Sequence, residues 1–253
     1  MKIFEGKVAL VTGGSIGIGR ATAVDFAEKG AAVVVADINA KEAEKTLKFI
    51  EQAGAKAHFI LADVSKDKDA NGMVMEAVSV FSRLDFACNN AGIEGVSAPL
   101  ADMKWEDWER VINVNLSGVF LSMKYEIPEM LKAGGGAIVN MASILGNVGF
   151  ANAAAYTAAK HGMLGLTKVA ALEYASQGIR VNAVCPAFID TPMLERAGIT
   201  TDETVRKTMV GMHPIGRLGE PEEIAKVVTW LCTPDASFIA GEGLLVDGGY
   251  VAR

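Results

Sequence analysis

The chain has 253 residues, 51% of them hydrophobic and 21% charged, with a formal net charge of −6, so nothing in its charge favours nucleic acid or an anionic membrane as a partner. Its three cysteines, Cys88, Cys185 and Cys232, lie far apart, which argues against a disulfide framework or a zinc site. No signal-peptide pattern and no apolar run of membrane-spanning length occurs, so we expect a cytoplasmic protein with no membrane partner.

Short apolar runs alternate with helical patterns along the whole chain. In chain order, the predicted strands are 8–11, 32–36, 57–61, 84–88, 137–141, 179–184 and 243–246, and the predicted helices are 17–30, 40–53, 66–82, 106–132, 153–176 and 221–232. Continuously apolar strands suit a parallel sheet that is covered on both faces. The order therefore predicts an α/β, doubly wound (Rossmann) fold with a mostly parallel seven-stranded sheet and helices on both faces.

One such sheet absorbs the chain, and no linker, repeat or low-complexity tract interrupts it. We therefore expect 1–253 to form a single domain. The stretch 187–220 differs, because it has mixed polarity and lies between the sixth strand and the last helix. Ligands of doubly wound sheets bind outside the carboxyl ends of the strands, so this stretch is predicted to cover a substrate.

A glycine-rich loop follows the first predicted strand and opens the first helix. Its glycines have the spacing Gly-x-x-x-Gly-x-Gly, which an ordinary turn hardly explains. Glycines allow a close approach of the backbone to a pyrophosphate, and a helix N-terminus adds free N–H groups and a positive dipole end. The residues predicted to bind the pyrophosphate of a dinucleotide are Gly13, Ser15, Ile16, Gly17, Ile18 and Gly19.

Asp37 ends the second predicted strand, where the adenosine ribose of a dinucleotide would lie. A carboxylate there accepts hydrogen bonds from the ribose hydroxyls of NAD and repels the 2′-phosphate of NADP. Position 16 is Ile, so the loop offers no cation for that phosphate at this position. The alternative is that Asp37 caps a helix. Because the loop and Asp37 agree, NAD is the predicted cofactor.

Tyr156 and Lys160 are spaced i and i+4 on a predicted helix, so they share one face, and Ser143 lies thirteen residues upstream of Tyr156. A phenol beside an ammonium is a general acid/base. A free tyrosine has a pKa of about 10, so only about one in a thousand is ionised at neutral pH. The ammonium and an oxidised nicotinamide would both favour the ionised form. The loop and this trio together predict transfer of a hydride and a proton.

Over essentially its whole length the chain closely resembles the short-chain dehydrogenase/reductase family. The matching motifs are Thr12 to Gly19, Asp63-Val64, Asn89-Asn90-Ala91-Gly92, Asn115, Ser143, Tyr156-x-x-x-Lys160, and Pro186 with Thr191. The resemblance implies that Tyr156 transfers the proton, that Lys160 supplies charge and binds the nicotinamide ribose, and that Ser143 binds the substrate oxygen. It also implies that Asn115 holds a water of a proton relay, although a helix kink or an interior hydrogen bond would equally explain Asn115.

The same resemblance implies further cofactor contacts. Asp63 would contact the adenine ring with Val64 packed against it, Asn90 and Gly92 would shape the cofactor floor, and Thr191, with the backbone from Pro186 to Ile189, would hold the carboxamide. One departure is Ala187, where the family usually has glycine. If that position needs a positive φ, alanine costs roughly 1 kcal/mol or more and shifts the backbone beside the nicotinamide.

The side chains expected around the reacting carbon are largely apolar. The predicted substrate residues are Glu94, Ser143, Leu145, Phe150, Tyr156, Phe188 and Met193, and further candidates are Ile93, Val96, Ile144, Val148, Leu194, Met209 and Met212. Half of these could simply pack the cover onto the sheet, and solvation is the slightly favoured explanation of Glu94. His213 is expected to cap or pack. The three histidines have no metal-ligand companions, so no metal is predicted.

These features favour an NAD-dependent oxidoreductase that interconverts a secondary alcohol and a ketone on an apolar or cyclic small molecule. A 3-oxoacyl-carrier-protein ketoreductase is the second hypothesis, although it would usually prefer NADPH and show basic residues for its acidic carrier. A hydroxysteroid or sugar dehydrogenase and a non-catalytic NAD-binding scaffold or sensor stay open. The helices 106–132 and 153–176 are apolar on more than one face, and the family resemblance implies that they build a homotetramer.

Overall fold

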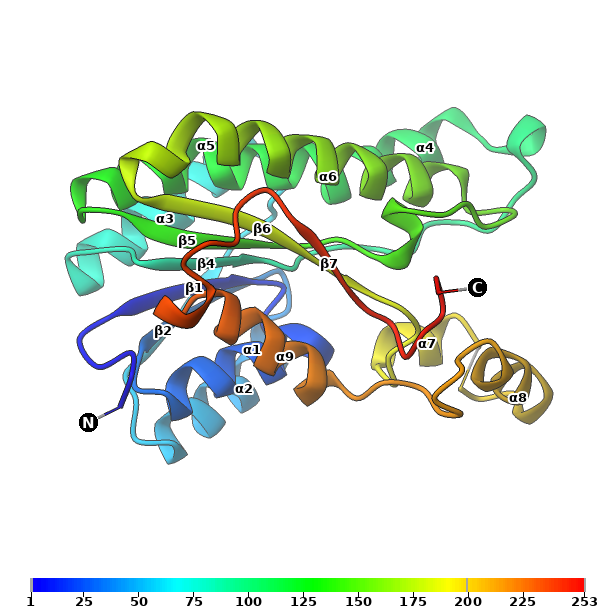
Figure 1. Ribbon diagram of the computed structural model, residues 1–253, viewed down its shortest axis with the longest axis horizontal. Coiled ribbons are helices and arrows are strands. Elements are labelled where there is room, and N and C mark those ends of the chain that lie inside the picture. The colour runs from blue at the N-terminus through cyan, green and yellow to red at the C-terminus, as the bar shows by residue number, and fades with distance from the viewer. Residues whose placement is uncertain (1, 199, 253) are drawn as a thin grey trace.

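The computed structural model describes residues 2–198 and 200–252; residue 199 of the predicted cover lies outside them. Seven parallel strands form one sheet in the order β3-β2-β1-β4-β5-β6-β7 (Figure 1). The strands are β1 (Val8–Thr12), β2 (Ala32–Asp37), β3 (Ala57–Leu61), β4 (Phe86–Asn89), β5 (Gly136–Met141), β6 (Ile179–Pro186) and β7 (Gly243–Val246). The predicted fold class is confirmed.

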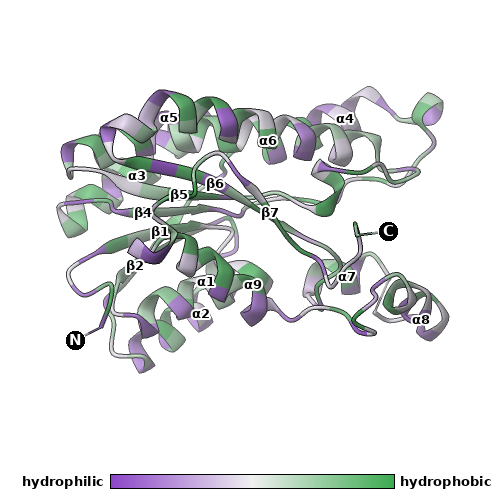
Figure 2. Ribbon diagram, in the orientation of Figure 1, coloured by the Kyte–Doolittle hydropathy of each residue, from purple (hydrophilic) through white to green (hydrophobic). Residues whose placement is uncertain are grey.

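Helices cover both faces of this sheet. One face carries α1 (Gly17–Glu28), α2 (Ala40–Gln52) and α9 (Pro221–Leu231), and the other carries α3 (Asp67–Phe81), α5 (Gly118–Lys132) and α6 (Ala154–Tyr174). The sheet is therefore the middle of three layers, with an apolar core on each side. Figure 2 shows this in the green, hydrophobic strands and in the purple residues on the outer helix faces.

Local sequence explains where these helices begin. Asn39 caps α2, because its side chain accepts a hydrogen bond from the Glu42 N–H at 3.2 Å. In α9, Glu220 and Glu223 form a reciprocal capping box, and Pro221 occupies the first helical position. The buried residues of α2, which are Ala43, Thr46 and Ile50, recur every three or four positions, as one packed face requires.

The predicted helix 106–132 is interrupted. It consists of α4 (Trp105–Ile112), a π-helical turn (Asn113–Ser117) and α5. Extra-residue turns of this kind occur often at functional sites. The sequence prediction missed this turn because the backbone stays helical on both sides of it, so no capping residue or loop marks its position. The predicted strand 84–88 is observed as Phe86–Asn89; the Asp85 backbone just before it still bonds to Val8 and Ala137, so the difference is one of bounds only.

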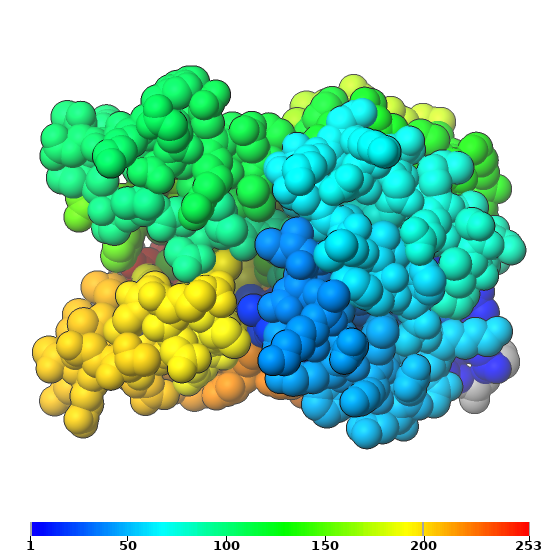
Figure 3. All heavy atoms as spheres, turned by 180° about the vertical axis from the view of Figure 1, so that it is seen from behind, coloured from blue at the N-terminus to red at the C-terminus, as the bar shows by residue number. Residues whose placement is uncertain are grey.

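The segment between β6 and α9 contains two short helices, α7 (Pro192–Arg196) and α8 (Glu203–Gly211), which were not predicted. It lies beyond the carboxyl ends of the strands (Figure 1). From behind, a hollow separates the yellow α7–α8 segment from the green segment above it (Figure 3). Successive strands are added toward one edge of the sheet from β1 to β3 and toward the other edge from β4 onward. The carboxyl ends of β1 and β4 are therefore where a doubly wound fold binds its ligand. Among the described residues, no helix is long and apolar enough to cross a membrane.

Candidate active site

The glycine loop is a backbone cradle tied to the end of β4. Gly13 has φ +63°, and a Cβ atom on Gly19 would lie only 2.1 Å from the Gly13 carbonyl oxygen, so neither position tolerates a side chain. The Asn90 amide donates to the carbonyl oxygens of Thr12 and Gly13, both at 3.0 Å. Ile16, at the N-cap of α1, makes no side-chain capping bond. The first N–H groups of α1 are therefore left for a ligand such as a pyrophosphate.

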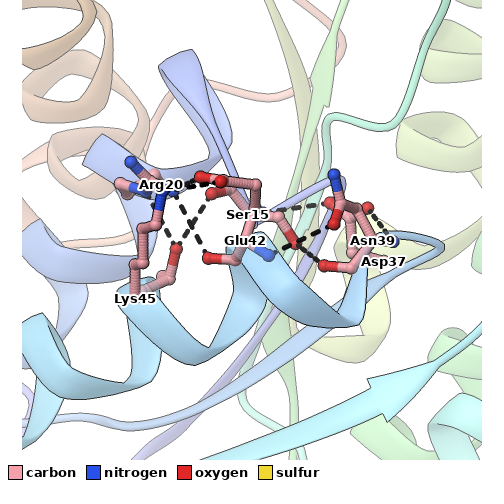
Figure 4. A network of polar contacts seen from close by, with 7 residues as sticks. Ser15, Arg20, Asp37, Asn39, Glu42 and Lys45 are labelled. Carbon is pink, nitrogen blue, oxygen red and sulfur yellow. Dashed lines mark hydrogen bonds and ion pairs between the residues drawn. The ribbon is translucent and has the colours of Figure 1, made fainter.

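Asp37 braces this cradle from the end of β2 (Figure 4). Its carboxylate accepts hydrogen bonds from the N–H of Ser15 at 3.0 Å and from the N–H of Asn39 at 2.9 Å. The alternative that Asp37 caps α2 is wrong, because Asn39 is the capping residue. A carboxylate has about four lone-pair sites, so two remain for ribose hydroxyls.

The cation that follows the loop is turned away from it. Arg20 donates to the Glu42 carboxylate at 2.9 Å and to the Thr46 hydroxyl at 3.0 Å (Figure 4). Lys45 reaches the other oxygen of Glu42 at 2.7 Å, and hydrogen bonds from Lys45 and then Arg20 lower the Glu42 pKa. Arg20 is thus already paired with Glu42, and the contact of Asp37 with a ribose stays a prediction.

Ser143, Tyr156 and Lys160 meet beyond the end of β5. Tyr156 and Lys160 project from α6, and Ser143, two residues beyond β5, is hydrogen-bonded to the Tyr156 phenol. The Ser143 Oγ also accepts from the Leu145 N–H at 3.1 Å. The Lys160 ammonium donates to the Met141 carbonyl at 2.5 Å and lies 5.4 Å from the centre of the Tyr156 ring. The structure therefore brings the predicted trio together.

Burial dominates the ionisation of this trio. Although Tyr156 keeps some exposure through the cavity, burial raises its pKa to about 12, against the Ser143 hydrogen bond that lowers it, and Glu94 adds a further increase. Burial also lowers the pKa of Lys160 to about 8. In the protein without cofactor, burial therefore outweighs the influences that favour the ionised form of Tyr156.

Asn115 lies in the π-helical turn and is fully buried. Its side-chain oxygen accepts from the Ile93 N–H, and its amide donates to the Ile93 carbonyl, both at 2.8 Å. Both structural explanations, the helix irregularity and the interior hydrogen bond, therefore hold. The side chain fixes the segment that follows Gly92, and the water-relay role stays a prediction.

A cavity of about 260 Å³ opens beside Tyr156. All seven predicted substrate residues line it, together with Ile144 and Leu194 from the further candidates. Those of the further candidates that do not line it are Ile93, Val96, Val148, Met209 and Met212. Sequence reasoning missed Met141, Ala142, Ala153 and Ala197, which line it as well. For Met141 and Ala142, their place directly before Ser143 was an available signal.

The predicted cofactor residues divide into two groups. Ile18, Asn90, Gly92, Pro186, Ile189 and Thr191 line the same cavity as Tyr156 and Lys160. The others, which are Gly13, Ser15, Ile16, Gly17, Gly19, Asp37, Asp63 and Val64, do not line it. Thr191 joins the two groups, since a Cβ atom on Gly17 would lie 3.4 Å from its methyl carbon. Thr191 therefore links the cavity beside Tyr156 to the start of α1, as the predicted dinucleotide site requires.

Asp63 and Val64 lie two and three residues beyond the end of β3. Partial burial raises the Asp63 pKa, but hydrogen bonds from Ser65 and Lys66 outweigh it and lower the pKa below its ordinary value. Val64 is buried against Gly118, where a Cβ atom would lie only 2.8 Å from its side chain. Their contact with an adenine ring stays a prediction.

The expected strain at Ala187 is absent. Among the described residues, the only non-glycine residues with positive φ are Ser82 and Asn152. Ala187 donates its N–H to the Val246 carbonyl at 3.4 Å, so the strand-end geometry accommodates a side chain. The departure from the family's usual glycine is therefore compatible with an undistorted site.

His213 packs behind the cavity wall, as expected. One ring nitrogen lies 2.8 Å from the Met209 carbonyl, and the other accepts from the Phe188 N–H at 3.4 Å. Its ring contacts the rings of Phe188 and Tyr250 at centroid distances of 5.9 and 5.5 Å. Glu94 lies 3.7 Å from Arg196 of α7, so its carboxylate is partly paired as well as solvated. Within the described ranges, no cluster of three or more His, Cys, Asp or Glu side chains could hold a metal ion.

Comparison with known proteins agrees with this site. A family model described as Enoyl-(Acyl carrier protein) reductase matches residues 13–251. Cyclohexanol dehydrogenase of Acinetobacter sp. is 49% identical over 99% of this chain and 97% of its own length. Cis-4-hydroxycyclohexanecarboxylate dehydrogenase of Sinomonas cyclohexanicum is 45% identical over 98% of each. A 3-oxoacyl-(acyl-carrier-protein) reductase of Thermotoga maritima is 40% identical over 98% of each chain.

Solved structures agree equally well. The crystal structure of levodione reductase superimposes with a TM-score of 0.96, at 36% identity over 99% of each chain. That of NAD⁺-bound xylitol dehydrogenase gives 0.93, at 36% identity over 97% of this chain and 99% of the other. These full-length matches confirm the predicted oxidoreductase class and agree with the predicted cofactor. The chain belongs to the short-chain dehydrogenase/reductase family.

Proposed function

We propose that this chain is an NAD(H)-dependent dehydrogenase that interconverts a secondary alcohol and a ketone on a small, cyclic, apolar molecule. The observation that carries the proposal is that the Tyr156 and Ser143 hydroxyls reach a cavity whose other walls are mostly apolar. At about 260 Å³ the cavity is at the small end of ligand sites, which favours a single ring over a steroid. The two cyclohexane-based relatives support the same substrate class.

The side chains of this site divide the chemistry between them. Ser143 donates its hydroxyl proton to the substrate oxygen, since its Oγ already accepts from Leu145. Tyr156 takes the hydroxyl proton from an alcohol or returns it to a ketone. Lys160, held by the Met141 carbonyl, binds the nicotinamide ribose and places positive charge beside the phenol. When bound, NAD⁺ would supply the hydride acceptor, and its positive charge before the transfer would offset the effect of burial on Tyr156.

The cofactor proposal rests on Asp37 and the glycine loop. The remaining lone pairs of Asp37 would accept the ribose hydroxyls, and the paired Arg20 offers no free charge to a 2′-phosphate. Asn90 and Gly92 would form the cofactor floor, and Thr191 with Pro186 and Ile189 would hold the carboxamide. The Asp37 carboxylate and the paired Arg20 also count against an acyl-carrier-protein reductase that uses NADPH. That function is the second candidate, because the acyl-carrier-protein reductase of Thermotoga maritima is 40% identical.

Three further proposals concern the molecule as a whole. We infer that the chain is one domain, in which 187–220 covers the substrate, and that it works in the cytoplasm. We also infer a homotetramer built on α5 and α6. Phe120, Val169 and Leu172 on these helices are 50%, 52% and 86% exposed, which is unusual for large apolar side chains and suits burial between subunits. Light scattering at micromolar concentration should give a tetramer, and a monomer would refute this inference.

Replacing Tyr156 by Phe tests the proposed reaction. We expect kcat/KM for cyclohexanol oxidation to fall about 10²- to 10⁴-fold, because the proton acceptor is lost. Binding of NADH, followed by its fluorescence, should stay close to that of the parent. Turnover on a panel of cyclic, steroidal and acyl ketones then separates the substrate classes. Undiminished turnover by the variant would remove Tyr156 from the mechanism.

A further inference from the structure

Beneath the active site, a carboxylic acid lies in the core with no charge to neutralise it. Glu126, on the sheet-facing side of α5, has no exposed surface. Within the described part of the chain, the one hydrogen bond of its side chain comes from the Asn89 amide at the end of β4, at 3.1 Å to Oε2. An isolated buried carboxylate is strongly disfavoured, so a group in this position either finds a cation or stays protonated.

The atoms left without partners identify which of these applies. Oε1 of Glu126 and Oδ1 of Asn89 are both buried, and neither has a hydrogen-bond partner among the described residues. They belong to the same two planar groups that the bond from Asn89 Nδ2 to Glu126 Oε2 already joins. Oε1 of an ionised Glu126 and Oδ1 of Asn89 are both acceptors, so they cannot form a hydrogen bond with each other. One proton on Oε1 turns it into a donor that satisfies Oδ1.

We propose that Glu126 is held as a neutral carboxylic acid that forms a two-point pair with the Asn89 amide, and that this pair positions the ends of β4 and β5 under the active site. In the pair, Asn89 donates from Nδ2 to Oε2, and Glu126 donates its proton from Oε1 to Oδ1. The Ser122 hydroxyl, one helical turn before Glu126, is also buried without a hydrogen-bond partner among the described residues, and in the alternative to this pair it would turn to donate to an ionised Glu126.

The pair continues into the strands that carry the site. The Asn89 amide also donates to the Asn140 side-chain oxygen at 3.1 Å, and the Asn140 amide donates to the Thr167 hydroxyl at 2.9 Å. Asn89 directly precedes Asn90, which holds the glycine loop. Asn140 directly precedes Met141, whose carbonyl holds Lys160. Glu126 therefore acts through its neighbours, as a positioning residue.

The charged and titratable surroundings agree with a neutral acid. The titratable groups on the elements packed against α5 are Asp67, Lys68, Asp69 and Glu76 on α3, Cys88 on β4, and Arg180 and Cys185 on β6. The cations near the sheet are engaged elsewhere, since Arg180 donates to the carbonyls of Leu231 and Ala236 and Lys160 to Met141. Burial raises the pKa of Glu126 to about 8, and the Asn89 hydrogen bond only partly opposes this. Burial, then Cys232 and then Glu126 raise the pKa of the Cys88 thiol.

The first test is the infrared carbonyl band of an un-ionised carboxylic acid in the full-length protein at pH 7. The other carboxyl groups with resolved shifts, which are Glu42, Asp63, Asp67, Asp85 and Glu223, have lowered pKa values, so we expect the band to come from Glu126. It should vanish in Glu126→Gln and persist in Glu51→Gln, which changes an exposed carboxylate of α2. Absence of the band in the parent overturns the proposal, including the case in which Ser122 donates to an ionised Glu126.

The second test is the pH dependence of unfolding. Between about pH 4.5 and pH 8 the folded state would hold a proton that the unfolded state releases. Stability therefore falls as pH rises through this window, and the unfolding constant of the parent should rise about tenfold per pH unit relative to Glu126→Gln. Glutamine has the shape of the neutral acid and donates in its place. Parallel curves for parent and variant would refute the neutral acid.

The positioning role rests on the proposed cofactor, so its test is kept separate. Glu126→Leu removes both bonds of the proposed pair, leaves the Asn89 amide held only by Asn140, and should weaken NADH binding about fivefold or more, the scale of a lost buried hydrogen bond. Glu126→Gln should bind NADH within about twofold of the parent. Equal binding by the leucine variant would overturn the positioning role. Failure of the parent itself to bind NADH would instead count against the proposed function, while the infrared and unfolding results stand alone.

Discussion

Asp37 shows how one side chain joins structure to specificity. Its carboxylate accepts hydrogen bonds from the backbone of Ser15 and Asn39, so Asp37 fixes the conformation of the loop and also places a negative charge beside it. Repulsion of a second anion at ~4 Å amounts to about 1 kcal/mol in water and several at the effective dielectric of a protein surface. The shape and the charge are partly separable, because asparagine loses the charge but keeps one acceptor oxygen for one of the two backbone N–H groups, whereas alanine loses both bonds.

We therefore expect Asp37→Asn to raise the ratio of kcat/KM for NADP⁺ over NAD⁺ by about tenfold or more. Steady-state kinetics with both cofactors measure this ratio. Asp37→Ala is the matched control, because it removes the charge together with the bonds to Ser15 and Asn39. A ratio that stays constant in Asp37→Asn would show that the carboxylate does not face the ribose.

The π-helical turn between α4 and α5 positions a buried side chain of the site. It places Asn115 where its two side-chain atoms match the N–H and carbonyl of Ile93. Ile93 follows directly on Gly92, so the turn fixes the loop that forms one wall of the site. A straight helix would carry the same residues in a different angular order, so the side chain would point elsewhere.

Asn115→Ala should lower the free energy of unfolding by about 1–3 kcal/mol, because buried backbone groups of Ile93 lose their partners. Asn113→Ala, in the same turn but exposed, is the control and should change it by less than about 0.5 kcal/mol. Denaturant unfolding measures both. Equal effects of the two substitutions would mean that the bonds to Ile93 contribute little.

At the scale of the whole molecule, ion pairs at the amino ends of the central strands complement the site at their carboxyl ends. Asp85 has 3% of its side chain exposed and binds Lys7, Arg83 and the Val8 N–H, which joins β1 to β4. Burial raises its pKa, but the bonds from Arg83, Lys7 and Val8 outweigh this and lower it. A lowered carboxyl pKa stabilises the fold above the unfolded value near 4, and this stabilisation is lost as pH falls further.

Asp85→Asn should therefore destabilise the protein by about 1–3 kcal/mol at pH 7 and make its stability less sensitive to acid below about pH 4. Thermal unfolding midpoints from pH 7 to pH 3 provide the measurement. Asp102→Asn, at an exposed position, is the control and should follow the parent. A variant as stable as the parent at pH 7 would rule out a structural role for this cluster.

The sequence by itself determined the features that depend on neighbouring residues. Apolar runs separated by turns predict the strands of the parallel sheet, and residue spacing predicts the glycine loop and the Tyr156–Lys160 pair. Each of these signals lies within a single strand, loop or helical turn. Only the tertiary structure decided the burial that raises the pKa of Tyr156, the bonds of Asn115 to Ile93, and the pairing of Glu126 with Asn89. Asn115 and Ile93 lie 22 positions apart in the sequence, and Glu126 and Asn89 lie 37 positions apart. The burial of Tyr156 depends on atoms from several elements at once. A local sequence pattern cannot predict such contacts, because they form only when distant segments pack together in the folded chain.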